Sequence, residues 1–163
     1  MPVSTALTIR FLTGGIILGH NQLSSTLSPS MSRLSNLGTY DPTCLLLPCK
    51  FEIARAHADV RPLLEVILDL KDNHLAGTLP TQLGLLQRLR RLHLLGNELV
   101  GTVPSSLGNL TNLEKLTLQY TTLEGSMPYE VCMLRSMQLT FLTADCLNST
   151  LVCESPACCS TCY

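Results

Sequence analysis

The sequence predicts a right-handed α/β solenoid, in which short coils of chain stack on one another instead of enclosing one globular core. A unit of 24 residues recurs, marked by one Gly and one Pro in each of three copies: Gly77, Gly101, Gly125, Pro80, Pro104 and Pro128. Leucine fills 35 of the 163 positions, whereas only 14% of the residues are charged and Trp is absent. Six of the eight cysteines lie between Cys132 and Cys162, which predicts a covalently closed C-terminal end.

The first half of each unit has the pattern of a short strand with one buried face. Leu92 and Leu94 flank one outward residue, and side chains of a strand alternate with a period of two. Stacked coils place such strands side by side, so we expect a short parallel sheet on the concave side. Asn97 follows the strand, and its amide can satisfy backbone groups in the bend. Together with Asn73 it predicts an asparagine ladder.

The second half of each unit predicts a convex side rich in 3₁₀ helix. Gly101 permits a bend that a Cβ atom would obstruct, and Pro104 fixes φ for the segment that follows. Leu107, Leu110 and Leu113 then return to the interior at helical spacing. Each coil therefore closes within one repeat and leaves apolar edges that neighbouring coils and caps must cover.

The repeat divides the chain into five segments. We expect an irregular N-terminus at 1–15, a degenerate repeat at 16–39, an irregular connection at 40–62, three regular repeats at 63–135, and a terminal strand with a cysteine-rich cap at 136–163. In the degenerate repeat, Asn21 takes the place that Asn73 has later. Near the C-terminus, the offset of 24 places Leu142 beside Leu118 and puts Asp145 at the ladder position.

The C-terminal cysteines predict a disulfide-rich cap over the end of the leucine core. The six candidates are Cys132, Cys146, Cys153, Cys158, Cys159 and Cys162. A bond between the adjacent Cys158 and Cys159 would be strained, and the other pairings stay open. Zinc is the competing interpretation, but the tail lacks His and well-separated C-x2-C pairs, so we expect no metal and no cofactor. Cys44 and Cys49 would close a separate small loop or stay as buried thiols.

So many cysteines, expected to form disulfides, indicate an oxidising compartment, and we expect an extracellular or cell-surface protein. Two sequons, at Asn109 and Asn148, fit glycosylation there. The apolar stretch 6–18 is a poor signal peptide, because Arg10 interrupts it. No apolar run reaches about 18 residues, so we expect no membrane-spanning helix. The net charge of −1 argues against nucleic acid as a partner.

We expect the concave strand face to bind a partner, because its outward residues stack in columns on a mixed polar surface without a pocket. The candidate contacts are Lys71, Arg91, His93, Lys115, Thr117 and Gln119. The alternative for each is a merely solvated strand residue. His93 and Asp69 do not make a convincing acid/base pair, since neither a third orienting group nor a cleft accompanies them. We therefore expect no enzyme.

Residues 73–86 read N-x-L-x-G-x-L-P-x-x-L-G-x-L, and segment 63–134 resembles the leucine-rich repeats of plant-type receptor-like proteins. The C-terminal end, with Gly125 to Leu134, Leu142 to Cys146 and Cys158 to Cys162, resembles the cap of the large leucine-rich-repeat group of diatoms and related algae. The resemblance implies a non-enzymatic, secreted or cell-surface recognition module that binds a protein or glycan on its concave face. An inhibitor of a secreted hydrolase and a structural or adhesive cell-wall component are the alternatives.

Overall fold

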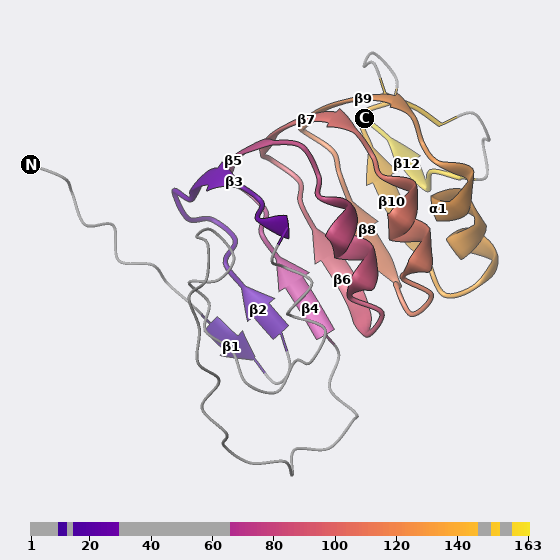
Figure 1. The fold of residues 1–163 in the computed structure, drawn as a ribbon, viewed down its shortest axis with the longest axis horizontal. Coiled ribbons are helices and arrows are strands. Elements are labelled where there is room, and N and C mark those ends of the chain that lie inside the picture. The colour runs from indigo at the N-terminus through magenta and orange to yellow at the C-terminus, as the bar shows by residue number, and fades with distance from the viewer. Residues whose placement is uncertain (1–9, 13–14, 30–65, 147–150, 154–157) are drawn as a thin grey trace, which may run out of the picture.

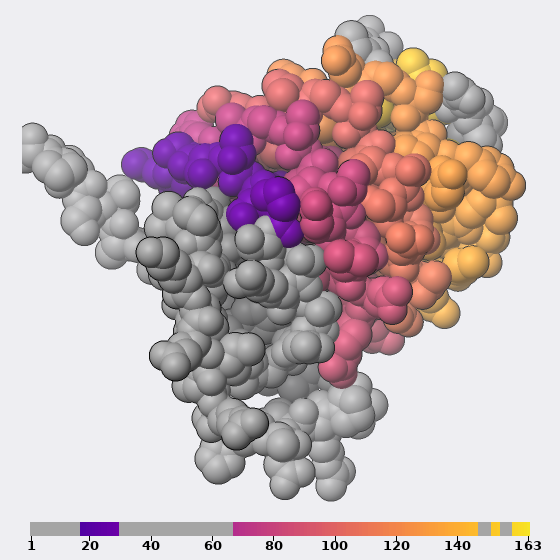
Figure 2. Space-filling view, viewed as in Figure 1, coloured from indigo at the N-terminus to yellow at the C-terminus, as the bar shows by residue number. Residues whose placement is uncertain are grey.

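The structure is a computed structural model, and it describes residues 10–12, 15–29, 66–146, 151–153 and 158–163. These residues form the α/β solenoid that the repeat predicts, with successive coils stacked side by side (Figure 1). Figure 2 shows the coils as adjoining bands of colour from magenta to orange. The connection 40–62, with Cys44 and Cys49, lies outside the described residues.

Within the described residues, seven strands form the concave sheet, in the order β1, β2, β4, β6, β8, β10 and β12. Their bounds are Arg10–Leu12, Gly15–Ile17, Val66–Asp69, Leu89–His93, Lys115–Thr117, Phe141–Ala144 and Thr161–Cys162. From β2 onward all neighbours are parallel, and Leu68, Leu92 and Leu116 lie side by side in register. The predicted parallel sheet is confirmed.

The N-terminal edge of this sheet differs from the sequence-based expectation. Strand β1 falls inside the segment 1–15, for which no regular structure was expected, and it pairs antiparallel with β2. Strand β2 in turn pairs with β4, with Ile16 beside Leu68, across a long stretch of intervening chain. An antiparallel strand therefore covers the edge of the parallel stack.

A second sheet, which the sequence analysis did not predict, lies along the turn side. Its order is β11 (Leu151–Val152), β9 (Thr122–Ser126), β7 (Glu98–Thr102), β5 (His74–Gly77) and β3 (Ser24–Thr26). In β5, buried Leu75 stands between less buried neighbours, and the strand reaches Gly77 at a φ of 78°. A Cβ there would approach Thr26 Cγ2 to 2.8 Å. One buried residue per strand is too short a pattern to predict a sheet.

Helical turns follow the three prolines, as the sequence predicts. They are the 3₁₀ helices η3 (Thr81–Leu85) and η4 (Ser105–Asn109), the α-helical turn α1 (Tyr129–Met133), and η5 (Leu134–Ser136), which continues it. Pro80, Pro104 and Pro128 each stand immediately before a turn, with φ values of −71°, −74° and −59°. Because the proline ring fixes φ, each coil enters its convex segment at the same point.

A leucine core fills the space between the two sheets and the helical turns. Leu92, Leu94, Leu99, Leu107 and Leu110 have no accessible surface. Burial of a leucine side chain typically contributes about 1.5–3 kcal/mol, and every coil repeats this contribution. The curved stack is therefore held together mainly between coils, since the residues of one coil bury those of the next.

The asparagine ladder is present and fixes the turns after β4 and β6, through Asn73 and Asn97. Asn97 Nδ2 donates to Leu94 O in its own coil and to Leu70 O in the preceding coil, both at 2.9 Å. Its Oδ1 accepts from Leu75 N at 3.1 Å. In the next coil, Thr121 continues the pattern by donating its hydroxyl to Leu118 O at 2.7 Å. At Thr121 the ladder position therefore keeps the hydrogen bond within its own coil.

The last concave strand lies two residues away from the predicted register. Leu142 pairs with Leu116 and not with Leu118, so the offset is 26 residues instead of 24. The two additional residues lie between Leu134 and Leu139, where the backbone hydrogen bond spans five residues and its counterpart in the preceding coil spans three. The helical segment of α1 and η5 is longer than the preceding 3₁₀ turns and accommodates this insertion.

Candidate functional site

The concave face is a grid, because parallel strands in register bring equivalent residues side by side. Row one contains Ile67, Arg91, Lys115 and Phe141, row two contains Asp69, His93, Thr117 and Thr143, and row three contains Lys71, Leu95 and Gln119. The six residues predicted to bind a partner therefore lie on or directly after three adjacent strands, β4, β6 and β8.

These six residues differ in how much surface they offer. Lys115 is exposed, whereas Lys71, Arg91 and His93 are half-buried. Thr117 and Gln119 are buried, with relative exposures of 3% and 8%. Thr143 explains part of this burial, since it lies beside Thr117 and its hydroxyl donates to Gln119 Oε1. The binding role of all six stays a prediction.

His93 is held as a neutral ring at the centre of the grid. Burial lowers the pKa of His93, and the nearby cations Lys71, Arg91 and Lys115 lower it further, against the opposing effect of Asp69. Its Nδ1 atom lies 3.2 Å from Thr117 Oγ1. Because the pKa is below the usual value of about 6.5, the ring carries little charge at pH 7.

The carboxylate of Asp69 is bound by Lys71, two residues further along the chain. Its Oδ1 accepts a hydrogen bond from Lys71 N at 3.2 Å, and its Oδ2 lies 3.8 Å from Lys71 Nζ. The residue is also buried, with a relative exposure of 8%. These contacts anchor the start of the turn, so the arrangement of Asp69 and His93 does not resemble an oriented acid/base pair.

Four residues with a left-handed backbone conformation, which the sequence did not predict, form a rim beside the third row. His20, Asp72 and Tyr120 have φ values of 58°, 51° and 58°, and Gly96 has 66°; each comes directly before a ladder position. His20 Nδ1 lies 3.1 Å from Asp72 Oδ2, and the Tyr120 ring centroid is 5.6 Å from that of Tyr163. The signal available in the sequence was the recurrence of this position at the repeat spacing.

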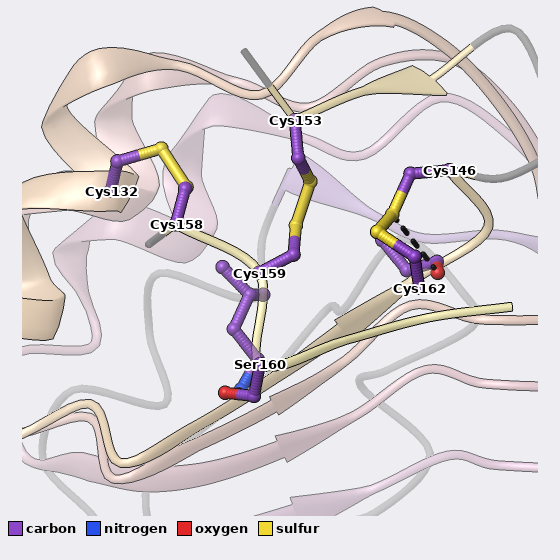
Figure 3. The surroundings of a disulfide bond; sticks show 9 residues. Cys132, Cys146, Cys153, Cys158, Cys159, Ser160 and Cys162 are labelled. Carbon is purple, nitrogen blue, oxygen red and sulfur yellow. Dashed lines mark hydrogen bonds between the residues drawn. A yellow bond between two sulfur atoms is a disulfide. The ribbon is translucent and has the colours of Figure 1, made fainter. Parts of the chain in front are cut away.

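Three disulfides close the described C-terminal end: Cys132–Cys158, Cys146–Cys162 and Cys153–Cys159 (Figure 3). Their Cα–Cα distances of 4.8, 5.0 and 6.2 Å lie in the range that disulfides require. The first joins α1 to the tail, and the second joins the segment after β10 to β12. Cys158 is buried and belongs to the core, so the cap extends the leucine stack.

The same sulfur atoms bear on the zinc alternative. The Sγ atoms of Cys146, Cys153 and Cys159 all lie within 4.8 Å of one another, a spacing that a metal ion could bridge. Metal binding needs thiolates, however, and in the structure each of these atoms belongs to a disulfide. The oxidised cap therefore offers no thiolate from these three residues.

One of the two predicted glycosylation sites lies on the described surface. Asn109 ends η4 on the surface, and Thr111 is also exposed. Asn148 lies outside the described residues. Across the part of the chain that the structure describes, no helix has the length and apolar character needed to cross a bilayer.

Comparison with known proteins agrees with the geometry. Residues 88–110 match the family model described as Leucine Rich Repeat. The fold is a leucine-rich-repeat solenoid. The leucine-rich-repeat ectodomain of the receptor kinase SOBIR1 from Arabidopsis thaliana is 24% identical, with a TM-score of 0.59 over 88% of this chain and 60% of that one.

Two further structures of proteins from Arabidopsis thaliana are similar to this leucine-rich-repeat solenoid. The BIR2 ectodomain is 21% identical, with a TM-score of 0.55 over 90% of this chain and 59% of that one. A chain of the BIR3–SERK2 complex is 25% identical, with a TM-score of 0.54, 86% coverage of this chain and 56% of that one. The chain thus spans less than two thirds of the length of each of these neighbours. The search of curated proteins returned no match.

Proposed function

We propose that this chain is a non-enzymatic recognition module of an extracellular, receptor-like leucine-rich-repeat protein, and that its concave face binds a protein partner. One observation carries the proposal. Leu92 and Leu116 are equivalent residues in register, as the framework requires, whereas the outward residues beside them change from strand to strand. His93, for example, is paired with Thr117. A fixed framework with a variable outer face is typical of repeat proteins that bind through an extended surface.

The chemistry of the face supports binding more than catalysis. Its centre holds a neutral His93, while Asp69 is engaged by Lys71. Catalysis by such a pair would need an oriented base and a site for the reacting atom. A broad row of polar and charged side chains instead offers the complementarity that a protein surface uses.

Several features support a protein partner outside the cell. One similar structure, of 25% identity, is a complex of two proteins, BIR3 and SERK2. The three disulfides favour an oxidising compartment. The exposed position of Asn109 supports glycosylation there, and we extend this proposal to Asn148. The cysteine spacing of the tail supports a cap of the kind found in diatoms and related algae.

Site-specific photocrosslinking tests which face binds. We would place p-benzoylphenylalanine at Leu95, in row three of the concave face, and in a matched variant at Val100, which is 44% exposed on β7 of the other sheet. Each full-length variant is mixed with extracellular fluid from its source and irradiated, and the adducts are identified by mass spectrometry. We expect one recurrent protein adduct from Leu95 and none from Val100. Adducts from Val100 alone would reject the concave face.

A further inference from the structure

Two tyrosine rings meet where the turn after β8 approaches the C-terminal tail. The ring centroids of Tyr120 and Tyr163 lie 5.6 Å apart, and the ring planes are inclined by 53°. Aromatic pairs in contact have centroids about 4.5–7 Å apart, so these two rings touch. Both residues are also open to solvent, since Tyr120 is 62% exposed and Tyr163 is 43% exposed. The pair is therefore close together and accessible to a reagent in solution.

The backbone holds both tyrosines against the same short segment at the end of β10. Directly after Tyr120, Thr121 N donates a hydrogen bond to Asp145 Oδ2 at 3.0 Å. Tyr163 N donates to Ala144 O, also at 3.0 Å. The two tyrosines are thus fixed through consecutive residues, 144 and 145. Because a tyrosine side chain has only two χ angles, such anchoring keeps the rings within reach of each other.

Tyr120 has a backbone conformation that disfavours a bulky residue. Its φ is 58°, and the equivalent position in the preceding coil is Gly96, with a φ of 66°. Glycine adopts positive φ freely, whereas residues with large side chains rarely do. The turn by itself therefore favours Gly over Tyr, and the ring contact with Tyr163 is what Tyr120 adds at this position.

We propose that Tyr120 and Tyr163 are a site of oxidative crosslinking, at which a peroxidase acting with hydrogen peroxide forms a dityrosine bond. Each phenol loses one electron and one proton, and the two phenoxyl radicals couple through a carbon ortho to each hydroxyl. The hydrogens on these two carbons then move to the oxygens. One C–C bond thus replaces two C–H bonds, and the electrons and protons removed reduce one peroxide molecule to two water molecules.

The surroundings favour coupling between these two rings. Every cysteine among the described residues belongs to a disulfide, so none of them offers a thiol that intercepts the oxidant. Tyr129 on α1 is more exposed, at 73%, but it has no ring contact within the part of the chain that the structure describes. Unlike a disulfide, a dityrosine bond is not opened by thiols. The crosslink goes beyond the proposed function, because it does not depend on what the concave face binds.

The test treats the full, folded chain with a haem peroxidase and hydrogen peroxide, then reduces the disulfides and digests the product with trypsin. Trypsin cleaves after Lys115 and Arg135. One fragment then contains Tyr120 and Tyr129, and the next contains Tyr163. We expect mass spectrometry to find these two fragments joined, with the loss of two hydrogen atoms. The joined product should persist in the matched control Y129F and disappear in Y120F and in Y163F.

Two further measurements separate ring proximity from mere reactivity, and the first needs no variant. Dilution by about tenfold should leave the wild-type yield unchanged, because coupling within one molecule does not depend on concentration. The variant C146S/C162S frees β12 and should lower the yield about tenfold, because the rings are no longer held together. Joined fragments in Y163F, covalent dimers as the sole product, or oxidised protein without dityrosine would each overturn the proposal.

Discussion

The middle coil, residues 88–111, and the last coil together with the terminal strand β10, residues 112–146, perform the same structural task with different chemistry. The middle coil has neighbours on both sides; its leucines belong to the shared core, and Asn97 hydrogen-bonds both its own coil and the preceding one. The last coil has one regular neighbour, and the cysteine tail covers its other side through Cys132 and Cys146. Covalent bonds therefore replace the stacking energy that a further coil would provide.

The largest effect should come from a cavity in the middle coil. Leu107 is fully buried, and Leu107→Ala should lower the free energy of unfolding by about 2–5 kcal/mol, because it removes packing between two pairs of coils. Urea unfolding followed by circular dichroism measures this. Leu85, which is 53% exposed on η3, is the matched control, and Leu85→Ala should cost less than about 0.5 kcal/mol. Equal losses would contradict the stacked core.

Removal of a cap disulfide should have the next largest effect, and a more local one. The double variant C146S/C162S frees β12 from the segment after β10 and should cost about 2–4 kcal/mol. Hydrogen exchange should accelerate in β10 and β12 and stay unchanged in β6, because each coil contacts only its neighbours. Uniform acceleration through all strands would show that the two regions unfold as one unit.

The ladder allows a direct comparison of the same position in both coils. Asn97→Ala removes a buried amide and leaves carbonyl groups of two coils without their donor, which should cost about 1–3 kcal/mol. Thr121→Ala removes one hydroxyl that bonds only within its own coil, and should cost about 1 kcal/mol. Thermal unfolding of both variants tests the order. A larger loss of stability for Thr121→Ala than for Asn97→Ala would contradict the inter-coil role assigned to Asn97.

The smallest expected effect is a pH dependence of stability caused by His93. It is specific to the middle coil, because the last coil contains no histidine. The pKa of His93 is lowered by folding, so the unfolded chain binds the proton first as the pH falls. Stability associated with His93 is therefore complete above about pH 6.5 and declines as the pH falls through the lowered folded-state value. The variant H93N should flatten this part of the stability profile. An unchanged slope would mean that other groups cause it.

The candidate site was only partly accessible from the sequence. Alternation places Arg91, His93 and Lys115 on the outer face of their strands, and the structure puts them on adjacent strands. The burial of Thr117 was not predictable from the sequence. It depends on Thr143, which lies in a strand whose register is shifted by two residues. The Tyr120–Tyr163 contact was likewise hidden, since it needs the tail to return beside β10.

The sequence by itself determined the coil: a period of 24 residues, an inward leucine at each framework position, Asn97 at the bend and Pro104 before the convex turn. These features are local and repetitive, so steric rules and periodicity suffice to predict them. The tertiary structure alone decided the second sheet, the three cysteine pairings and the antiparallel β1. Each of these depends on which distant segments meet, and contacts between distant segments leave no periodic signal in the chain.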